Sequence, residues 1–151
     1  MRQGLALIAA AWLFGVAGAA AQTPLPLITT DAEARSLVQA ARSWQVERAR
    51  AAGVEPMVAT ARIDLNGDGQ AEIVAVLQTP VKCQAMGLRD CPLIILRPDG
   101  SGRYTEVGTF FGYAVQLLDS RTLDWRDLES RFTKGPWRRT LWNGTMYRLT
   151  R

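Results

Sequence analysis

The sequence predicts an α+β fold in which one N-terminal helix packs on antiparallel sheet made of about eight short strands. A helical pattern with an apolar stripe occurs between residues 31 and 52. After Gly53 the chain changes to short runs rich in β-branched and aromatic residues, and Gly, Pro, Asn and Asp separate these runs. The dipeptide Asn143-Gly144 is a strong hairpin signal and indicates antiparallel pairing.

The first 21 residues have the features of a secretory signal peptide. One positive charge precedes an apolar run from Leu5 to Ala21, and the last three alanines fit the small-residue cleavage rule. The run is shorter than the roughly twenty residues that a spanning helix needs, so a retained anchor is the less favoured alternative. We therefore expect a periplasmic or secreted protein, without stable membrane insertion after signal cleavage. An extended leader (22–30) would precede a single globular domain (31–151).

The predicted helix begins near Asp31 and ends near Ala52. Thr30 and Glu33 have the spacing of a capping box at its start, and Gly53 is the expected stop. Its stripe is narrow and rich in alanine, which favours packing on a sheet over lying on a membrane surface. The stripe consists of Ala34, Leu37, Val38, Ala41 and Trp44.

The strands are expected to follow one another in a meander. Their predicted ranges are 57–64, 72–78, 92–97, 103–111, 114–118, 126–132, 136–142 and 145–149. Cys83 and Cys91 are the two cysteines of the chain. In an oxidising compartment we expect them to form one disulfide bond that staples a hairpin, worth about 2–3 kcal/mol. A reactive or metal-binding pair is the alternative, although the chain offers no histidine as a further ligand.

Residues 64–72, with the sequence Asp-Leu-Asn-Gly-Asp-Gly-Gln-Ala-Glu, are the most informative stretch. Oxygen-bearing side chains at its first, third and fifth places suit a loop around calcium, and Gly69 stands sixth, where such a loop turns sharply. A helical EF-hand is not favoured, because its twelfth place is Ala75, inside a predicted strand. An ion-free turn is the alternative, since Asn, Asp and Gly form turns by themselves. Three carboxylates within nine residues repel one another, however, and a turn alone does not need them.

These residues, with the strand that follows them, resemble the FG-GAP repeats of integrin-type propellers, in which a calcium loop runs into a strand. The resemblance covers about thirty residues of the chain. It implies a structural calcium ion. The implied ligands are the side chains of Asp64, Asn66, Asp68 and Glu72 and the backbone carbonyl of Gln70.

The chain departs from that family in copy number, because propellers need several blades. A faint internal repeat aligns Asp64 with Asp119 and Glu72 with Asp127 without a gap. It predicts two blade-like sheets. Only the first copy would bind calcium, since Arg121 and Leu123 occupy the third and fifth places of the second.

The composition argues against common catalytic machinery. Without histidine the chain has no Ser-His or Cys-His pair, and it has no nucleophile elbow or phosphate-binding glycine loop. An ion explains the carboxylate cluster better than catalysis does, so we expect no catalytic residues and no enzymatic activity. The predicted function is a structural or interaction module of the cell envelope. A small envelope-acting hydrolase, or a hydrolase inhibitor, is the alternative.

The carboxyl-terminal end is strongly basic. From Arg131 onward there are six basic residues and no acidic one, whereas residues 22–130 sum to −3. Aromatic residues alternate with these cations, a pattern that suits polyanions. For an exported protein we expect an unknown envelope protein or anionic polymer as partner, and no nucleic acid. The candidate contacts are Arg131, Lys134, Trp137, Arg138 and Arg139. Alternatively, Trp137 and Trp142 face the core and the arginines face water.

Overall fold

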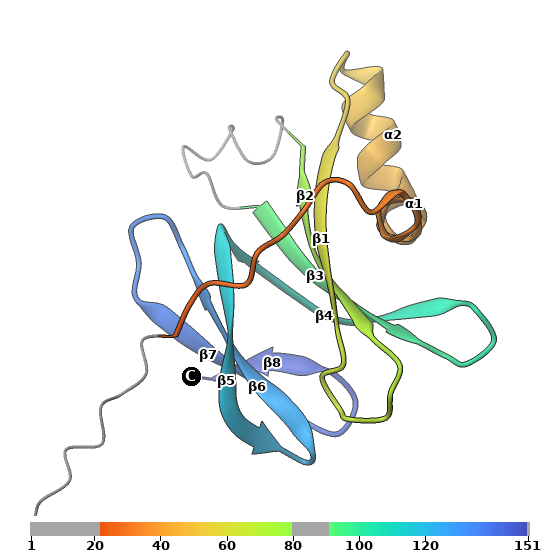
Figure 1. The fold of residues 1–151 in the computed structure, drawn as a ribbon. Helices are drawn as coiled ribbons and strands as arrows, with labels where there is room; N and C mark the ends of the chain where they lie inside the picture. The colour runs from red at the N-terminus through yellow and green to blue at the C-terminus, as the bar shows by residue number, and fades with distance from the viewer. Residues whose placement is uncertain (1–21, 80–90, 151) are drawn as a thin grey trace, which may run out of the picture.

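The computed structural model describes residues 22–79 and 91–150, so the predicted signal peptide, Cys83 and the predicted disulfide bond lie outside the described residues. Within these ranges the chain forms two helices and eight strands (Figure 1). The helices are α1 (Ala32–Ala41) and α2 (Ser43–Ala51). The strands are β1 (Met57–Ile63), β2 (Glu72–Gln78), β3 (Cys91–Pro98), β4 (Tyr104–Gly112), β5 (Ala114–Thr122), β6 (Trp125–Arg131), β7 (Trp137–Trp142) and β8 (Tyr147–Leu149).

The strands form two four-stranded sheets, the first in the order β1-β2-β3-β4 and the second in the order β5-β6-β7-β8. Every pairing is antiparallel and joins strands that follow each other in the sequence. The predicted α+β class and the antiparallel meander are therefore confirmed. Gly112 ends the first sheet where the two sheets come close together. A Cβ atom at Gly112 would lie 2.9 Å from the carbonyl oxygen of Arg131, which only glycine avoids.

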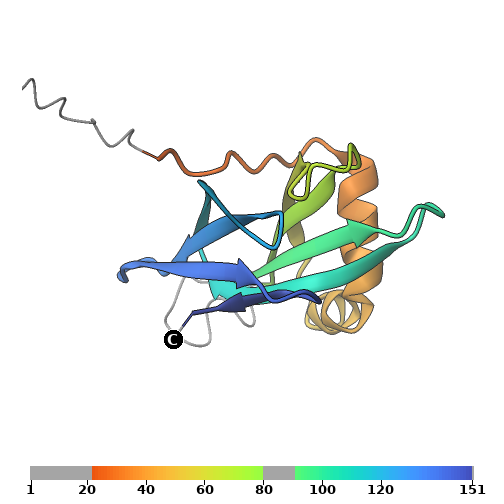
Figure 2. The same cartoon turned by 90° about the horizontal axis from the view of Figure 1, so that it is seen from below.

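The first sheet is the middle of three layers (Figures 1 and 2). One of its faces packs against the helices through a cluster that includes Val38, Val46 and Ile73. The other face packs against the second sheet through a cluster that includes Val74, Leu93 and Leu128. Strands β2 and β3 are buried along almost their whole length because both faces are covered. This explains why they are continuous apolar runs rather than alternating ones.

The predicted single helix is wrong in two respects. The chain breaks at Arg42 into α1 and α2, and Arg42 there donates a 2.6 Å hydrogen bond to Glu106 of β4. Beyond the break the helix turns a different side inward, so Trp44 is 50% exposed while Val46 is buried. The N-cap is Asp31 rather than Thr30, because the Asp31 side chain accepts the hydrogen bond from the N–H of Ala34.

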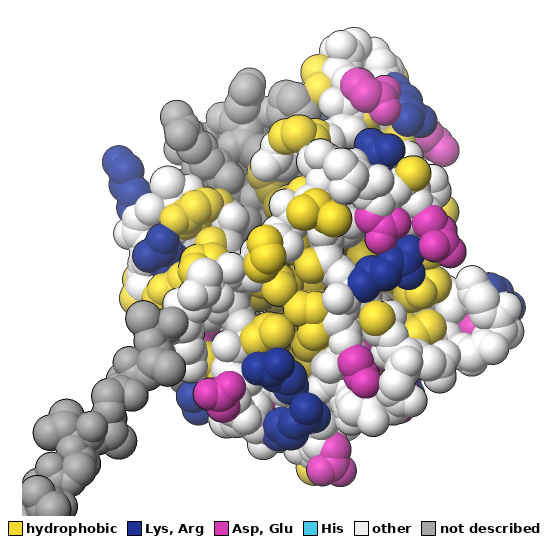
Figure 3. All heavy atoms as spheres, in the orientation of Figure 1, with side chains coloured by type: hydrophobic (Ala, Val, Ile, Leu, Met, Phe, Trp, Pro, Cys, Tyr) yellow, Lys and Arg dark blue, Asp and Glu magenta, His cyan; other side chains and the backbone are white. Residues whose placement is uncertain are grey.

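The leader forms part of the fold. Its Leu25 N–H donates to the carbonyl of Val115 in β5 at 2.7 Å. Ile28 exchanges two hydrogen bonds with Thr60 in β1, at 2.9 and 2.8 Å. The segment thus crosses from an edge of the second sheet to an edge of the first (Figure 1). Leu25 and Leu27 pack against the core, and Figure 3 shows hydrophobic side chains gathered in the middle of this face.

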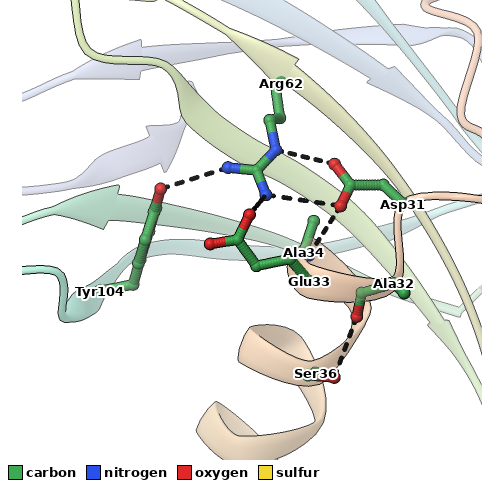
Figure 4. Close-up of polar contacts among 7 residues, drawn as sticks. All are labelled: Asp31, Ala32, Glu33, Ala34, Ser36, Arg62 and Tyr104. Atoms are coloured by element: carbon green, nitrogen blue, oxygen red, sulfur yellow. Dashed lines mark hydrogen bonds and ion pairs between the residues drawn. The ribbon is translucent and has the colours of Figure 1, made fainter.

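Arg62 of β1 ties the start of α1 to the first sheet (Figure 4). Its guanidinium donates to Asp31 at 2.7 Å, to Glu33 at 2.8 Å and to the Tyr104 hydroxyl at 3.4 Å. The hydrogen bond from Arg62, followed by that from the Ala34 amide, lowers the pKa of the Asp31 carboxyl. Asp31 therefore combines a helix cap with an ion pair.

Asp31→Ala should lower the urea midpoint of unfolding more than Glu33→Ala, which removes only an exposed ion pair. Because the folded state lowers the pKa of Asp31, its contribution is present above the unfolded pKa of about 3.9 and is lost as pH falls through the folded value. The gap between the two variants should therefore shrink below about pH 4. Urea titrations followed by circular dichroism at neutral and acid pH measure this, and equal midpoints at neutral pH would contradict it.

The turn between β5 and β6 contains backbone strain. Leu123 and Asp124 have φ angles of 50° and 67°, a conformation that suits Asn and Gly. The double variant Leu123→Asn/Asp124→Gly should therefore raise the free energy of unfolding by about 1 kcal/mol. The control Leu123→Ala removes the same exposed side chain but leaves a Cβ in the strained conformation. If both variants change the stability equally, loss of the apolar side chain is the cause and the strain explanation fails.

Candidate metal site

Residues 64–71 connect β1 to β2 and form a tight loop. Gly67 and Gly69 have φ angles of 80° and 84°, which a residue with a Cβ rarely adopts. Asp64 accepts hydrogen bonds from the N–H groups of these two glycines, at 2.7 and 2.9 Å. The bond from Gly69 contributes most to lowering the pKa of the Asp64 carboxyl. This carboxylate therefore stays ionised and organises the loop around itself.

The third and fifth places of the loop are paired with each other. The Asn66 amide nitrogen donates to Asp68 at 2.8 Å, and the Asn66 amide oxygen accepts from the N–H of Asp68 at 2.9 Å. Asp68 also accepts from the N–H of Gln70 at 2.7 Å. These side-chain to backbone bonds are those of an ion-free turn. In this arrangement the described residues contain no group of three acidic, histidine or cysteine side chains placed to hold a metal ion.

Glu72 closes the loop from the first position of β2 and is completely buried. Its Oε2 atom accepts a 2.8 Å hydrogen bond from the N–H of Leu65. Its Oε1 atom is buried without a hydrogen-bond partner. Burial raises the pKa of the Glu72 carboxyl, and the negative charges of Asp68 and Asp64 raise it further. An unpartnered buried carboxylate oxygen is costly unless a proton or a cation compensates it.

The structure therefore brings the predicted ligands only partly together. Asp64 and Asp68 act electrostatically on Glu72. Asp64 and Asn66 are half-buried, whereas Asp68 and Gln70 are exposed. Asp68 would have to turn from its Asn66 and Gln70 contacts in order to join a shared cation.

Leu65 has a role that the sequence analysis missed. Its side chain is fully buried in the cluster between the sheets. Its carbonyl oxygen accepts from the N–H of Arg126 at 2.8 Å and from the Arg121 guanidinium at 3.4 Å. Leu65 thus joins the two sheets, because its N–H binds Glu72 of the first sheet and its carbonyl binds residues of β5 and β6 in the second. The signal was an apolar residue at the second place of an otherwise polar loop.

Three aromatic rings lie on the second-sheet side of this junction. Trp125 and Trp142 stack with centroids 4.0 Å apart, and Tyr147 meets both edge-on at 5.9 and 5.5 Å. The Tyr147 hydroxyl donates to the carbonyl of Arg126 at 2.7 Å. Burial raises the pKa of Tyr147, and the charges of Glu72 and Asp127 raise it further. The ring cluster and the buried carboxylates therefore share one region between the sheets.

Asp127 is a second buried carboxylate, only 3% exposed. Its Oδ2 atom accepts from the Ser120 hydroxyl at 2.6 Å, while its Oδ1 atom is buried without a partner. Ser120 precedes Asp127 by seven positions in the sequence, as Leu65 precedes Glu72.

The candidate polyanion contacts are not gathered on one surface. Arg138 and Arg139 are neighbours in β7, so their side chains point to opposite faces of the sheet. The Arg131 guanidinium lies 4.9 Å from the Trp137 ring centroid and 5.4 Å from that of Tyr113. Lys134 lies in the exposed connection before β7. Arg131 and Trp137 are thus brought together, and polyanion binding stays a prediction.

Replacing Glu72 with Gln should make stability less dependent on pH in calcium-free protein. Since burial raises the folded pKa of Glu72, its ionisation costs stability as pH rises through that value. The amide keeps an acceptor for Leu65 but carries no charge, so Glu72→Gln should gain stability relative to wild type as pH rises above the unfolded pKa of about 4.3. Melting temperatures in chelator measure this. Asp119→Asn removes a carboxylate that is 99% exposed and serves as control. A parallel pH profile for Glu72→Gln and wild type would contradict the prediction.

Neither described helix is long and apolar enough to cross a membrane. Comparison of the chain with protein-family models, curated proteins and solved structures finds no match.

Proposed function

We propose that this protein is an exported, non-catalytic module of the cell envelope in which calcium, bound by the loop at residues 64–72, braces the junction between two sheets. The observation that carries the proposal is the buried, unpartnered Oε1 atom of Glu72, on which the charges of Asp64 and Asp68 act. A divalent cation offsets the repulsion among three carboxylates and gives that oxygen a partner. The export part of the proposal depends on the signal-peptide features of residues 1–21.

The loop offers the ligands that calcium prefers. Calcium takes six to eight oxygen ligands, and carboxylates, amide oxygens, backbone carbonyls and waters all serve. The Asn66 amide and the Gln70 carbonyl would complete the set, as the FG-GAP resemblance implies. Because Asp68 and Gln70 are exposed, one side of the loop is open to solvent.

Calcium at this place would act on both sheets through Leu65. Asp64 precedes Leu65 in the chain, and Glu72 holds the Leu65 N–H. Fixing these two carboxylates restrains Leu65, whose carbonyl binds Arg126. The ion would therefore stabilise the contact between the sheets as well as the loop.

We further propose that the two sheets are blade-like copies of one unit. Both are four-stranded antiparallel meanders. In each, the second strand carries a buried carboxylate with one unpartnered oxygen, and the other oxygen accepts from the residue seven positions earlier. The second copy has Arg121 and Leu123 where the first has ligands, which favours a single calcium site.

Calcium should raise the melting temperature of the purified protein. At ten times the dissociation constant, linkage gives about 1.4 kcal/mol of stabilisation, or roughly 4–6 °C for a chain of this size. Asp68→Ala should abolish the increase, whereas Asp119→Ala, at the aligned position of the second sheet, should retain it. Differential scanning calorimetry with calcium, with magnesium and with chelator measures the effect. An unchanged transition in calcium would overturn the calcium proposal.

Two readouts test the remaining parts of the proposal. Hydrogen exchange of the Arg126 amide should slow in calcium if Leu65 transmits the effect to the second sheet. The hydrolase alternative predicts release of fragments from cell-wall material, with loss of that activity on substitution of Asp64 or Glu72.

A further inference from the structure

A polar groove of about 470 Å³ lies beside the calcium loop, a volume suited to a small ligand. Its walls come from the loop itself, from the β3–β4 hairpin and from the β7–β8 turn, which Figure 1 shows on the same side of the molecule. Its polar lining consists of Asp68, Gln70, Arg97, Asp99, Thr105 and Thr145.

The two acidic side chains of the groove already have partners. Asp99 accepts from the N–H and hydroxyl of Ser101, at 2.9 and 2.6 Å, and from Arg103. These hydrogen bonds, that from the Ser101 hydroxyl first, hold the pKa of Asp99 at about 2. Asp68 accepts from Asn66 and from the N–H of Gln70. Because both carboxylates already accept hydrogen bonds, neither needs a cationic ligand in the groove.

Arg97 is in the opposite situation. Its guanidinium carbon lies 5.3 Å from the Trp125 ring centroid. The guanidinium group makes no hydrogen bond or ion pair with any residue in 22–79 or 91–150. The indole ring of Trp125 is itself stacked on Trp142 and holds the guanidinium in place. The N–H donors of the guanidinium stay free. A donor fork held on a rigid ring loses little entropy when it binds a ligand.

The groove also has a local irregularity in its floor. The pairing of β3 with β4 shifts register between Ile95 and Leu96, which leaves Val107 as an extra residue opposite them. Val107 lines the groove. Such bulges commonly occur next to binding sites, where they redirect side chains.

We infer that this groove binds a small oxyanion-bearing ligand, a carboxylate or a phosphate, whose charged group is held by the guanidinium fork of Arg97. Gln70, Thr105 and Thr145 would bind hydroxyl or amide groups of the same ligand. The inference goes beyond the proposed function and does not require bound calcium. Calcium in the loop would tighten binding, because it would offset the negative charge of Asp68 at the edge of the groove.

The test titrates the isotope-labelled full chain, in chelator and again in calcium, with matched pairs of probes. Galacturonate and galactose test a carboxylate, and glycerol 3-phosphate and glycerol test a phosphate. The resonances of the Arg97 Nε–H and the Trp125 indole N–H report binding. One acidic probe should bind with a dissociation constant in the millimolar range or below, and its neutral partner should not.

Arg97→Gln should weaken that binding about tenfold, since a charge-assisted hydrogen bond is lost. Arg48→Gln, on α2 and outside the groove, is the matched control and should bind as wild type does. Thr145→Val, which removes one hydroxyl from the groove wall, should weaken binding by a smaller factor and covers the case that Arg97→Gln unfolds. Failure of both acidic probes, equal binding of the neutral ones, or binding unaffected by Arg97→Gln would overturn the inference. The calcium proposal is judged separately, by calorimetry without probe.

Discussion

The whole architecture depends on one buried hydrogen bond, between the Glu72 carboxylate and the N–H of Leu65. It turns the chain from β1 into β2 and buries a charge at the first position of the most buried strand pair. It also places the Leu65 carbonyl where the second sheet can bind it. Loop, first sheet and second sheet are therefore joined through one residue, Leu65. A change in the charge of Glu72 therefore affects the loop and both sheets.

The buried carboxyl of Glu72 lowers the stability of the ion-free fold. An apolar residue at position 72 would remove the desolvation cost of a carboxylate with one oxygen unpartnered. The acidic side chains of Asp64 and Asp68 nearby make the cost larger. In the proposed calcium-bound form, the cation would offset this cost.

Much of the sheet could be predicted because its signals are local. The runs Ile73–Leu77 and Leu93–Leu96 are apolar on both faces since helices cover one and the second sheet covers the other. The turn at Asn143 could be predicted because the Asn143 side chain accepts hydrogen bonds from the two N–H groups that follow Gly144. The break at Arg42, the inward role of Leu65 and the pairing of the leader were not predictable. Each depends on a partner far away in the sequence, Glu106, Arg126 and Val115 respectively.

The order of the strands also bears on how the protein folds. Every strand pairs with its neighbour in the sequence, so each sheet can be built from successive hairpins. The links between the sheets are different, because Leu25 meets Val115 and Leu65 meets Arg126 across long stretches of chain. We therefore expect the two meanders to form early and independently, and their docking, completed when the leader closes over both edges, to limit the rate at which native protein accumulates.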